Sequence, residues 1–587
     1  MATKKENAKK QTVRKKNKTT VSKKTTRRTE KSTNKTPIKI IPIGGVGEIG
    51  KNCYLYEYEN DIVIVDCGLT FPDEETPGID IVIPDFTYIL KNKEKIKALV
   101  VTHGHEDHIG AIPYLLKQFN IPIYTTRLTL GLIKGKLKEH GLLSSAKLFE
   151  LNAGDKIDFG KINVELVHVN HSIPDAVGVV IKTPVGTVVQ TGDFKIDTTP
   201  IDGEMINLAR FAELGKQGVL ALLSDSTNAE RPGFSASERI VGESFANLFK
   251  KASSGRIIVA SFSSNIHRIQ QIIDEAVKIG RKVAVIGRSM QNVVQVASEL
   301  GYLTVPENTL IEMENINKYP NDKLVIITTG SQGEPLSALH RMAYGDHRQV
   351  GIMPDDLIII SATPIPGNEK LVSKVINELM KQGAMVVYEK MYDVHVSGHA
   401  CQEELKLMLS LTKPRFFIPV HGEPKHLYKH AALAENMGIK KDNIVISNIG
   451  DVIELHKKSV KISETVPAGR VLVDGLGVGD VGSIVLRDRK HLAEDGVIVI
   501  SLTIDGATKD VLAGPEIISR GFVYVRESEE LMEALENNVC HIINNCLYNS
   551  KQNDWNTLKT KLRDGTSKFL YERTRRSPMI LPIIMEI

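Results

Sequence analysis

Cysteine is scarce in this chain. Its 587 residues include five cysteines, an odd number, and no two of them stand in a CxxC spacing: Cys53, Cys67, Cys401, Cys540 and Cys546. The scarcity excludes a disulfide framework, and the spacing excludes the usual zinc-finger and redox motifs. Reduced thiols are the simplest interpretation, so the composition predicts a cytoplasmic protein.

Long apolar runs are also missing. No stretch approaches the roughly 18 uninterrupted apolar residues that a membrane-spanning helix needs, and the first residues contain no apolar core of a secretory signal. We therefore expect no membrane association. With 42% hydrophobic and 25% charged residues, the composition is typical of a soluble globular protein. The chain is too long for one core and shows no internal repeats, so several domains are expected.

The net charge of +5 conceals two segments of opposite charge. Residues 1–36 hold 14 Lys and Arg against 2 Glu, which leaves 61 basic and 68 acidic residues in the rest of the chain. Because residues 1–36 are almost free of apolar side chains, we expect a disordered basic tail that binds polyanions by counterion release. The alternative is a solubilising tail. An organellar transit peptide is disfavoured, because the segment offers no apolar helix face.

The order of strand-like and helix-like segments predicts an α/β protein. Strands dominate up to residue 234, which favours two sheets packed face to face with helices outside. Helices then alternate with strands, a rhythm typical of a mostly parallel sheet. Near the end we expect strands at residues 496–504 and 521–525 and a helix at 528–545. The predicted units are a basic tail (1–36), a first sandwich part (37–234), an inserted α/β domain (235–394), a second sandwich part (395–466), a glycine-rich linker (467–490) and a small C-terminal α/β domain (491–587).

Three histidines and an aspartate are packed into six residues directly after an apolar run. The run, residues 96–101, predicts a buried strand, and His103, His105, Asp107 and His108 follow its end. From a strand end these side chains can turn toward one point. Neutral imidazole and carboxylate are the ligands that zinc takes in catalytic sites. We interpret the cluster as part of a zinc site.

Three more candidate ligands each follow a predicted strand. They are His171, Asp193 and His421. Taken singly, each would more often be a capping or core residue. As a set they fit a dinuclear site, which needs about eight ligand positions and a bridging carboxylate. Asp66, at a neighbouring strand end, is either a support for a ligand histidine or an ordinary turn residue.

The glycine run at residues 44–50 does not have the features of a nucleotide-binding loop. It lacks the Lys-Ser/Thr pair of a P-loop, and a strand rather than a helix follows it.

The motifs resemble a known family. The ligand positions resemble the metallo-β-lactamase hydrolases, and the chain from residue 37 to 587 resembles the β-CASP nucleases, in particular bacterial ribonuclease J. The resemblance is carried by residues 102–110, 171–175, 224–228, 329–335, 395–399 and 419–423. It implies an αββα sandwich with an inserted β-CASP domain and a small C-terminal α/β domain.

The resemblance also implies roles at the metal site. One zinc would be held by His103, His105 and His171, the other by Asp107, His108 and His421, with Asp193 between them. Two cations can lower the pKa of a water between them and neutralise charge on a scissile phosphate.

Proton transfer and phosphate binding would involve residues farther along the chain. The resemblance assigns His399 and Asp225 to catalysis as acid and base, without fixing which donates, although Asp225 also suits a helix cap. The phosphate-binding segment would be His395, Val396, Ser397, Gly398 and His399. A pocket for a 5′-terminal monophosphate would use Ser263, Ser264 and Asn265 before a predicted helix. Phe262 would stack on a base or lie in the core, and residues 329–334 would form a wall.

Calcium and partners complete what the resemblance implies. Gly78, Asp80 and Asp474 would bind a structural Ca²⁺, or be ordinary loop residues. The chain would bind single-stranded RNA and form a homo-oligomer, a dimer or tetramer, or associate with a paralogue or with proteins of a degradation complex. The C-terminal domain suits self-association or extension of the RNA path.

The leading hypothesis is a zinc-dependent ribonuclease that acts from the 5′ end and also cuts internally, in mRNA decay and rRNA maturation. A small-molecule hydrolase is disfavoured, because a small substrate needs no domain-sized insertion with phosphate ligands. A DNA-processing nuclease is disfavoured only by the family resemblance. A non-enzymatic RNA scaffold is disfavoured because all seven ligand positions are present.

Overall fold

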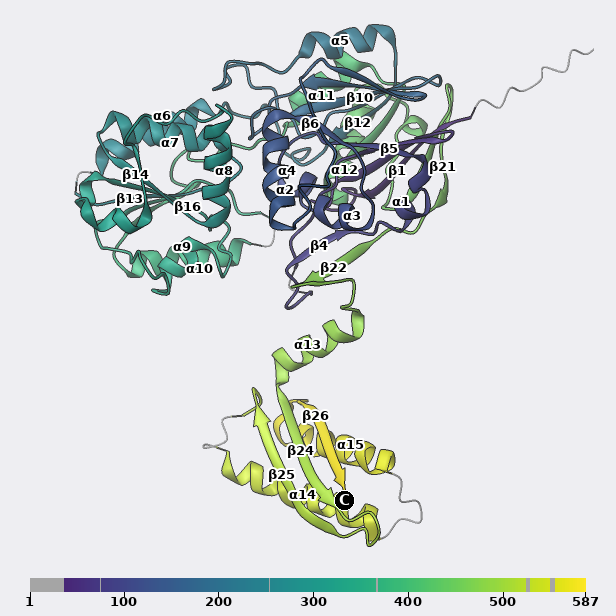
Figure 1. The fold of residues 1–587 in the computed structure, drawn as a ribbon, viewed down its shortest axis with the longest axis vertical. Helices are drawn as coiled ribbons and strands as arrows, with labels where there is room; N and C mark the ends of the chain where they lie inside the picture. The colour runs from purple at the N-terminus through teal and green to yellow at the C-terminus, as the bar shows by residue number, and fades with distance from the viewer. Residues whose placement is uncertain (1–35, 74, 253, 366–367, 524–527, 549–554) are drawn as a thin grey trace, which may run out of the picture.

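The computed structural model describes residues 36–73, 75–252, 254–365, 368–523, 528–548 and 555–587. The predicted basic tail, except for its last residue, lies outside the described residues. Two sheets built from distant parts of the chain form the main body (Figure 1). The first has the order β21 (Val460–Thr465), β20 (Asp451–Leu455), β1 (Ile38–Gly44), β2 (Cys53–Tyr58), β3 (Asp61–Val65), β5 (Ile96–Val100), β6 (Ile123–Thr126) and β7 (Leu148–Leu151).

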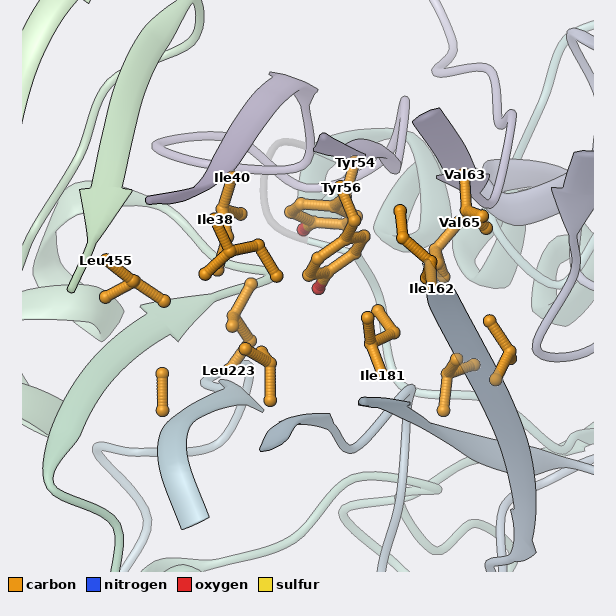
Figure 2. Packing of buried hydrophobic residues seen from close by; sticks show 14 of the residues in the cluster. Ile38, Ile40, Tyr54, Tyr56, Val63, Val65, Ile162, Ile181, Leu223 and Leu455 are labelled. Carbon is orange, nitrogen blue, oxygen red and sulfur yellow. The ribbon is translucent and has the colours of Figure 1, made fainter. Parts of the chain in front are cut away.

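The second sheet of this body faces the first. Its order is β19 (Phe416–Val420), β12 (Val219–Asp225), β11 (Thr187–Gln190), β10 (Val177–Lys182), β9 (Ile162–His168) and β8 (Lys156–Phe159). Alternate residues of the strands point inward, as a period of two requires. Tyr54, Val63 and Ile181 belong to the buried cluster between the sheets, which Figure 2 shows from close by.

Helices cover the outer face of each sheet. The remaining strand residues of the first sheet pack against α1 (Thr87–Lys91), α3 (Ile112–Gln118) and α4 (Arg127–Glu139). Those of the second sheet pack against α5 (Leu208–Gln217), α11 (Gln402–Thr412) and α12 (Pro424–Asn436). This layering confirms the predicted αββα sandwich.

A third sheet lies beside the sandwich and is wholly parallel. Its order is β15 (Leu310–Ile311), β14 (Lys282–Ile286), β16 (Leu324–Thr328), β13 (Ile257–Ala260), β17 (Leu357–Ile360) and β18 (Met385–Val387). One face carries α6 (Arg239–Lys251), α7 (Ile266–Lys278) and α8 (Arg288–Glu299), and the other carries α9 (Ala338–Ala343) and α10 (Glu369–Lys381) (Figure 1). Central strands such as β17 are buried throughout, because helices cover both faces. We call residues 239–387 the inserted domain.

The inserted domain leaves and rejoins the sandwich at adjacent strands. β12 precedes it in sequence and β19 follows it, yet the two pair in parallel, with Asp225 opposite Val420. The insertion therefore brings Asp225 next to His421. Short 3₁₀ helices occur at η1 (Lys93–Lys95), η2 (Met313–Lys318), η3 (Asn321–Lys323) and η4 (Lys441–Asn443).

The segment expected as a linker, residues 467–490, contains regular structure. β22 (Arg470–Asp474) pairs with β4 (Ile81–Pro84) and with β23 (Gly477–Val478). Helix α13 (Ser483–Asp495) then leads away from the sandwich (Figure 1). Glycine content suggested a linker here, but the pairing with β4, some 390 residues earlier in the chain, supplies the backbone partners.

The C-terminal sheet has the order β25 (Val511–Arg520), β24 (Val497–Ile504) and β26 (Met579–Glu586), and it packs against α14 (Glu529–Tyr548) and α15 (Trp555–Thr574). The strand expected at residues 521–525 is wrong for the part that the structure describes, since β25 ends at Arg520 and Gly521 has a φ of 71°. No helix among the described residues is long and apolar enough to cross a bilayer.

Candidate active site

The first ligand cluster lies where strand β5 ends and the short helix α2 (Glu106–Ile109) begins. His105 precedes α2 in extended conformation, and His108 lies within it, buried. Two other strand ends meet this cluster. Asp193 follows β11 and His421 follows β19, and both are buried. His421 has a φ of 54°, a left-handed conformation that turns its side chain back toward β5.

Three groups of donor atoms share the carboxylate of Asp193, and the ligand atoms within each group lie within 4.8 Å of one another. One of them joins Asp193 to Asp225, His399 and His421, and the other two consist of predicted metal ligands. Of these two, the first group adds His103, His105 and His171, and the second adds Asp107, His108 and His421. The structure thus brings together all seven positions that the sequence predicted.

Distances in the first group match the edges of a coordination polyhedron. The Nδ1 atom of His105 lies 3.1 Å from Nε2 of both His103 and His171. The Oδ2 atom of Asp193 lies 3.7 Å from His103 Nε2 and 3.9 Å from His171 Nε2. A tetrahedral zinc with bonds near 2.0–2.1 Å separates its ligand atoms by roughly 3.3 Å. These residues therefore fit a divalent cation.

The second group is as tight as the first. Asp107 Oδ2 lies 3.2 Å from His421 Nε2 and 3.5 Å from His108 Nε2. The same Oδ2 of Asp193 lies 3.3 Å from His108 Nε2 and 3.4 Å from His421 Nε2. One oxygen of Asp193 therefore faces both groups of candidate ligands.

Hydrogen bonds of the other ring nitrogen fix the tautomers of His103 and His108. The hydroxyl of Thr102 donates to Asp66, 3.0 Å away, so its oxygen accepts from His103 Nδ1 at 3.0 Å. His108 Nδ1 donates to Asp66 Oδ2 at 2.8 Å. Asp66 therefore orients the candidate ligand His108, which is the first of the two roles predicted for it.

The same argument applies to His171 and His421. His171 Nδ1 lies 2.7 Å from the carbonyl oxygen of Gly398, which can only accept. The hydroxyl of Thr227 donates to Asp225 at 2.7 Å and so accepts from His421 Nδ1 at 2.7 Å. When these four rings are neutral, Nε2 of each carries no proton. Four lone pairs facing carboxylate oxygens repel one another unless a cation or protons lie between them.

Burial and charge separate the pKa values of the cluster. Burial lowers the pKa of His103 and His171 well below the ordinary value, and that of His105 to about 4. Burial also opposes the charge of His108, but the carboxylates, Asp193 first, raise its pKa well above the ordinary value. Asp193, although buried, has its pKa lowered by His421 and His108. The carboxylates therefore stay ionised and attract cations.

His399 and Asp225 form a hydrogen-bonded pair at the edge of this cluster. His399 Nδ1 lies 2.8 Å from Asp225 Oδ2 and 4.0 Å from Asp193 Oδ2. Burial opposes protonation of His399, but Asp225 raises its pKa. The His399 side chain is 21% exposed, against 1% for Asp225, so the imidazole is the member that can reach a substrate. Asp225 Oδ1 also accepts from the backbone N–H of Thr227, as a turn residue would.

The predicted phosphate segment offers directed donors. Arg268, fully buried and paired with Glu238, donates to His395 Nδ1 at 3.0 Å, which leaves the proton of His395 on Nε2. Ser397 Oγ accepts from Asn228 Nδ2 at 2.8 Å and from the His399 N–H at 3.2 Å, so its own proton is free to donate.

The two apolar residues of this segment differ in their surroundings. Val396 is buried in the inserted-domain core. A Cβ on Gly398 would lie 2.8 Å from the ring of His171, so only glycine fits there.

The pocket predicted for a 5′ phosphate lies at the start of α7. Asn265 caps this helix by accepting from the Arg268 N–H at 3.1 Å, while Ser263 and Ser264 are half-buried. Phe262 is half-buried and belongs to no core cluster of the described residues. In the loop 329–334, Gln332 holds residues 363–365 through hydrogen bonds to Thr363 O and Ile365 N.

The residues predicted for calcium lie near an arginine. The guanidinium of Arg489 contacts the carbonyl oxygen of Gly78 at 3.0 Å and forms an ion pair with Asp474. Asp80 Oδ2 accepts from the Gly475 N–H at 2.7 Å. Arg489, on α13, supplies positive charge among these oxygens. No signal near residue 78 in the sequence points to a partner 411 residues away.

Sequence reasoning missed several residues that shape the site. Thr227 and Asn228 lie in a segment quoted for the resemblance, but their partners are residues near 397 and 421. Arg268 lies in an ordinary amphipathic helix, and only its complete burial marks it.

Family models match most of the chain. Residues 46–210 match the metallo-β-lactamase superfamily, and residues 254–379 match the ribonuclease J β-CASP domain. Residues 384–446 match the Zn-dependent metallo-hydrolase RNA specificity domain, and residues 484–587 match the ribonuclease J C-terminal domain.

Curated relatives cover almost the whole chain. Ribonuclease J2 of Bacillus subtilis is 46% identical over 95% of this chain and 100% of its own length. Ribonuclease J 1 of Streptococcus pyogenes is 48% identical over 93% of this chain and 97% of its own length. A crystal structure of a protein of unknown function from Enterococcus faecalis, 17% identical, covers 71% of this chain and 100% of its own with a TM-score of 0.51, which shows a shared fold. With relatives of this identity along nearly its full length, the chain belongs to the ribonuclease J family, a β-CASP branch of the metallo-β-lactamase superfamily.

Proposed function

We propose that this protein is a zinc-dependent ribonuclease with two Zn²⁺ per chain. It hydrolyses RNA phosphodiesters, removing nucleotides in the 5′-to-3′ direction from 5′-monophosphate ends and also cutting internally. The single observation that supports this best is the shared Asp193 oxygen. It lies between two groups of imidazole nitrogens, His103, His105 and His171 in one and His108 and His421 in the other. The names of the relatives, ribonucleases J, point to RNA as the substrate.

The metal ligands are those grouped by geometry, with Asp107 completing the second group. When bound, two divalent cations polarise the scissile phosphate and make nearby water more acidic. The protein orients its ligands through Asp66, Thr102 and Thr227, whose contacts keep Nε2 of the rings free of protons. The substrate charge is therefore met by a site whose geometry is set before binding.

His399 supplies the proton that the leaving alkoxide needs. Asp225 accepts from Nδ1, so Nε2 faces the more exposed side of the site. General acid catalysis of this kind contributes about 10²–10⁴-fold in rate. His395 and Ser397, with their free protons, and the backbone around Gly398 are placed to hold the nonbridging phosphate oxygens.

The 5′-monophosphate preference rests on the start of α7. The hydroxyls of Ser263 and Ser264 and the positive end of the dipole of this 13-residue helix favour an anion. Phe262, half-buried and outside the core clusters, suits stacking on a base. A nucleotide end held here would present its first phosphodiester to the metal centre.

The proposal also includes the domain boundaries, the cellular location, the oligomeric state and the cellular role. The domain division at residues 234, 394 and 466 also belongs to this proposal, and the separate six-stranded parallel sheet between residues 257 and 387 supports it. A cytoplasmic location follows from the few, unpaired cysteines, and homo-oligomerisation and a role in mRNA decay and rRNA maturation follow from the family resemblance.

The test compares RNA oligomers that differ only at the 5′ end. Oligomers with 5′-monophosphate, 5′-triphosphate and 5′-hydroxyl ends are incubated with the zinc-loaded protein, and products are resolved by length. We expect mononucleotides to be released fastest from the monophosphate oligomer, with internal fragments from all three. Equal release of mononucleotides from all three ends would contradict the 5′ preference. Cleavage of single-stranded DNA at the same rate as RNA would favour a DNA-processing nuclease instead.

A further inference from the structure

The glycine run at residues 44–50 lies against the metal centre. Gly45 has a φ of 81°, and a Cβ there would lie 2.3 Å from Asn52 Oδ1 and 2.4 Å from the hydroxyl of Tyr54. Only glycine therefore leaves room for these two side chains. The carbonyl oxygen of Gly45 accepts a hydrogen bond from the backbone N–H of His421 at 2.8 Å. A run that has no nucleotide-loop features is thus attached directly to a metal-ligand position.

Asn52 contacts the second group of ligands at close range. It is fully buried, and its backbone N–H donates to the carbonyl oxygen of Asp107 at 3.0 Å. Its Nδ2 lies 3.2 Å from that carbonyl oxygen, 3.3 Å from Asp107 Oδ2 and 3.1 Å from His108 Nε2. The amide therefore contacts Asp107 Oδ2 and His108 Nε2, the two atoms of these residues that would bind the cation. It makes no such contact to the first group in the described part of the chain.

The orientation of the Asn52 amide is determined by its neighbours. Both oxygens of Asp107 near it can only accept, so the NH₂ group must face them. The other end, Oδ1, lies 3.1 Å from the Tyr54 hydroxyl, which also lies 2.9 Å from Gly45 O. Tyr54, 1% exposed, has no solvent to compete with these contacts. The Tyr54 hydroxyl, whose single proton is shared between Gly45 O and Asn52 Oδ1, thus favours the orientation in which the amide donors face Asp107.

We propose that Asn52 is the positioning residue of one cation subsite, that of Asp107, His108 and His421. By donating to Asp107 Oδ2 it orients the carboxylate oxygen that would face the cation, and Gly45 O, which accepts from Tyr54, also accepts from the backbone N–H of His421. The inference rests on the proposed two-cation site. Because the contacts are confined to one group of ligands, a substitution at Asn52 lowers the affinity for one cation and leaves the affinity for the other unchanged. Supports of this kind typically contribute 10–100-fold in metal affinity.

The test measures cation binding without RNA. Metal-free wild type, Asn52→Ala and Tyr54→Phe are titrated with Co²⁺, and the d–d absorption and a chromophoric chelator report each binding step. We expect wild type to bind two ions. In Asn52→Ala one step should weaken about 10–100-fold, the same step that Asp107→Asn weakens, while the other step keeps its affinity and spectrum. Tyr54→Phe should weaken that step by a smaller factor.

Tyr56→Phe is the matched control. Tyr56 is equally buried on the same strand, and its hydroxyl donates to the amide oxygen of Gln190 at 2.7 Å, away from the ligands. It should leave both binding steps unchanged. The inference would be overturned if Asn52→Ala and Tyr54→Phe both bound Co²⁺ with wild-type affinity at each step. It would also be overturned if these variants lost affinity equally at the two steps. A wild type that binds fewer than two ions would instead contradict the proposed function.

Discussion

At the scale of single residues, the proposed mechanism divides the work of one catalytic group between the imidazole of His399 and the carboxylate of Asp225. Asp225 is buried and hydrogen-bonded on both oxygens, to His399 and to Thr227. His399 is the partly exposed member. The carboxylate thus orients the ring and stabilises its charged form, and the ring meets the substrate.

Replacing His399 should therefore separate turnover from metal binding. In His399→Ala we expect two zinc ions to remain, because the seven ligand positions are intact, and kcat to fall about 10²–10⁴-fold. Zinc content is measured by mass spectrometry under native conditions and kcat on a 5′-monophosphate oligomer. His340→Ala, on α9, is the control and should match wild type. Loss of zinc in His399→Ala would place His399 among the ligands and refute its role as proton donor.

Ser397 should act on substrate affinity. Its oxygen accepts from Asn228 and from the His399 N–H, so its hydroxyl proton is available for a phosphate oxygen. A hydrogen bond to a charged group is worth about 1.5–3 kcal/mol, so Ser397→Ala should lower kcat/KM about 10–100-fold, mainly through KM. Steady-state kinetics on the same oligomer measure this. An unchanged KM would exclude contact between Ser397 and the phosphate.

The residues of the site differ in how far sequence could predict them. His103, His105, Asp107 and His108 are a local cluster, so their spacing alone predicted them. Asn52 could not be predicted, because its role depends on a partner 55 residues away. Resemblance supplied candidate calcium ligands, but it contained no information about Arg489, which reaches Gly78 across 411 residues.

At the scale of helices and strands, the site consists of strand ends. Asp193 follows β11, Asp225 ends β12 and His421 follows β19, and these three strands are neighbours in one sheet. Apolar runs predicted the strands that precede Asp193 and His421, since buried strands carry a strong local pattern, whereas β12 was not predicted. Strand β25 was missed because its exposed, mixed residues become a strand only through pairing with β24.

Glu404, near the start of α11, joins three crossing segments. Its buried carboxylate accepts from the Ile196 N–H at 2.7 Å, the Ser235 N–H at 2.6 Å and the Cys401 N–H at 2.8 Å. Glu404→Gln replaces one acceptor oxygen by an NH₂ group that faces these donors. We expect the free energy of unfolding to fall by about 1–3 kcal/mol, measured by urea denaturation. Glu403→Gln, the partly exposed neighbour that pairs with Lys406, should change it by less than about 0.5 kcal/mol; equal effects would remove Glu404 from this structural role.

At the scale of the whole molecule, the inserted domain packs on the sandwich close to the metal centre. Leu128 and Ile173 of the sandwich are part of the inserted-domain core. Tyr302 donates to Asp175 at 2.9 Å, four residues after His171. The position of the inserted domain is thus tied to the loop that carries a metal ligand.

Two glycines of α4 allow this packing to be tested. A Cβ on Gly131 would lie 2.7 Å from Leu300 and 2.8 Å from Val296 at the inserted domain, whereas one on Gly135 would meet nothing within 4 Å. Overpacking costs about 1–3 kcal/mol, so Gly131→Leu should lower kcat/KM on RNA about 10-fold while zinc content stays at two. Gly135→Leu should match wild type. Equal activity of the two variants would show that the domain contact does not shape the substrate site.

Removal and stepwise return of zinc test most directly whether two cations held around Asp193 drive RNA hydrolysis. Purified protein is stripped with a chelator, its metal content is counted by native mass spectrometry, and cleavage of a 5′-monophosphate RNA oligomer is followed as Zn²⁺ is added back. If two cations are required, the stripped protein should not cleave the oligomer, and full activity should return only as the second ion binds. Cleavage that persists in the stripped protein, or activity that saturates with one ion, would contradict this requirement.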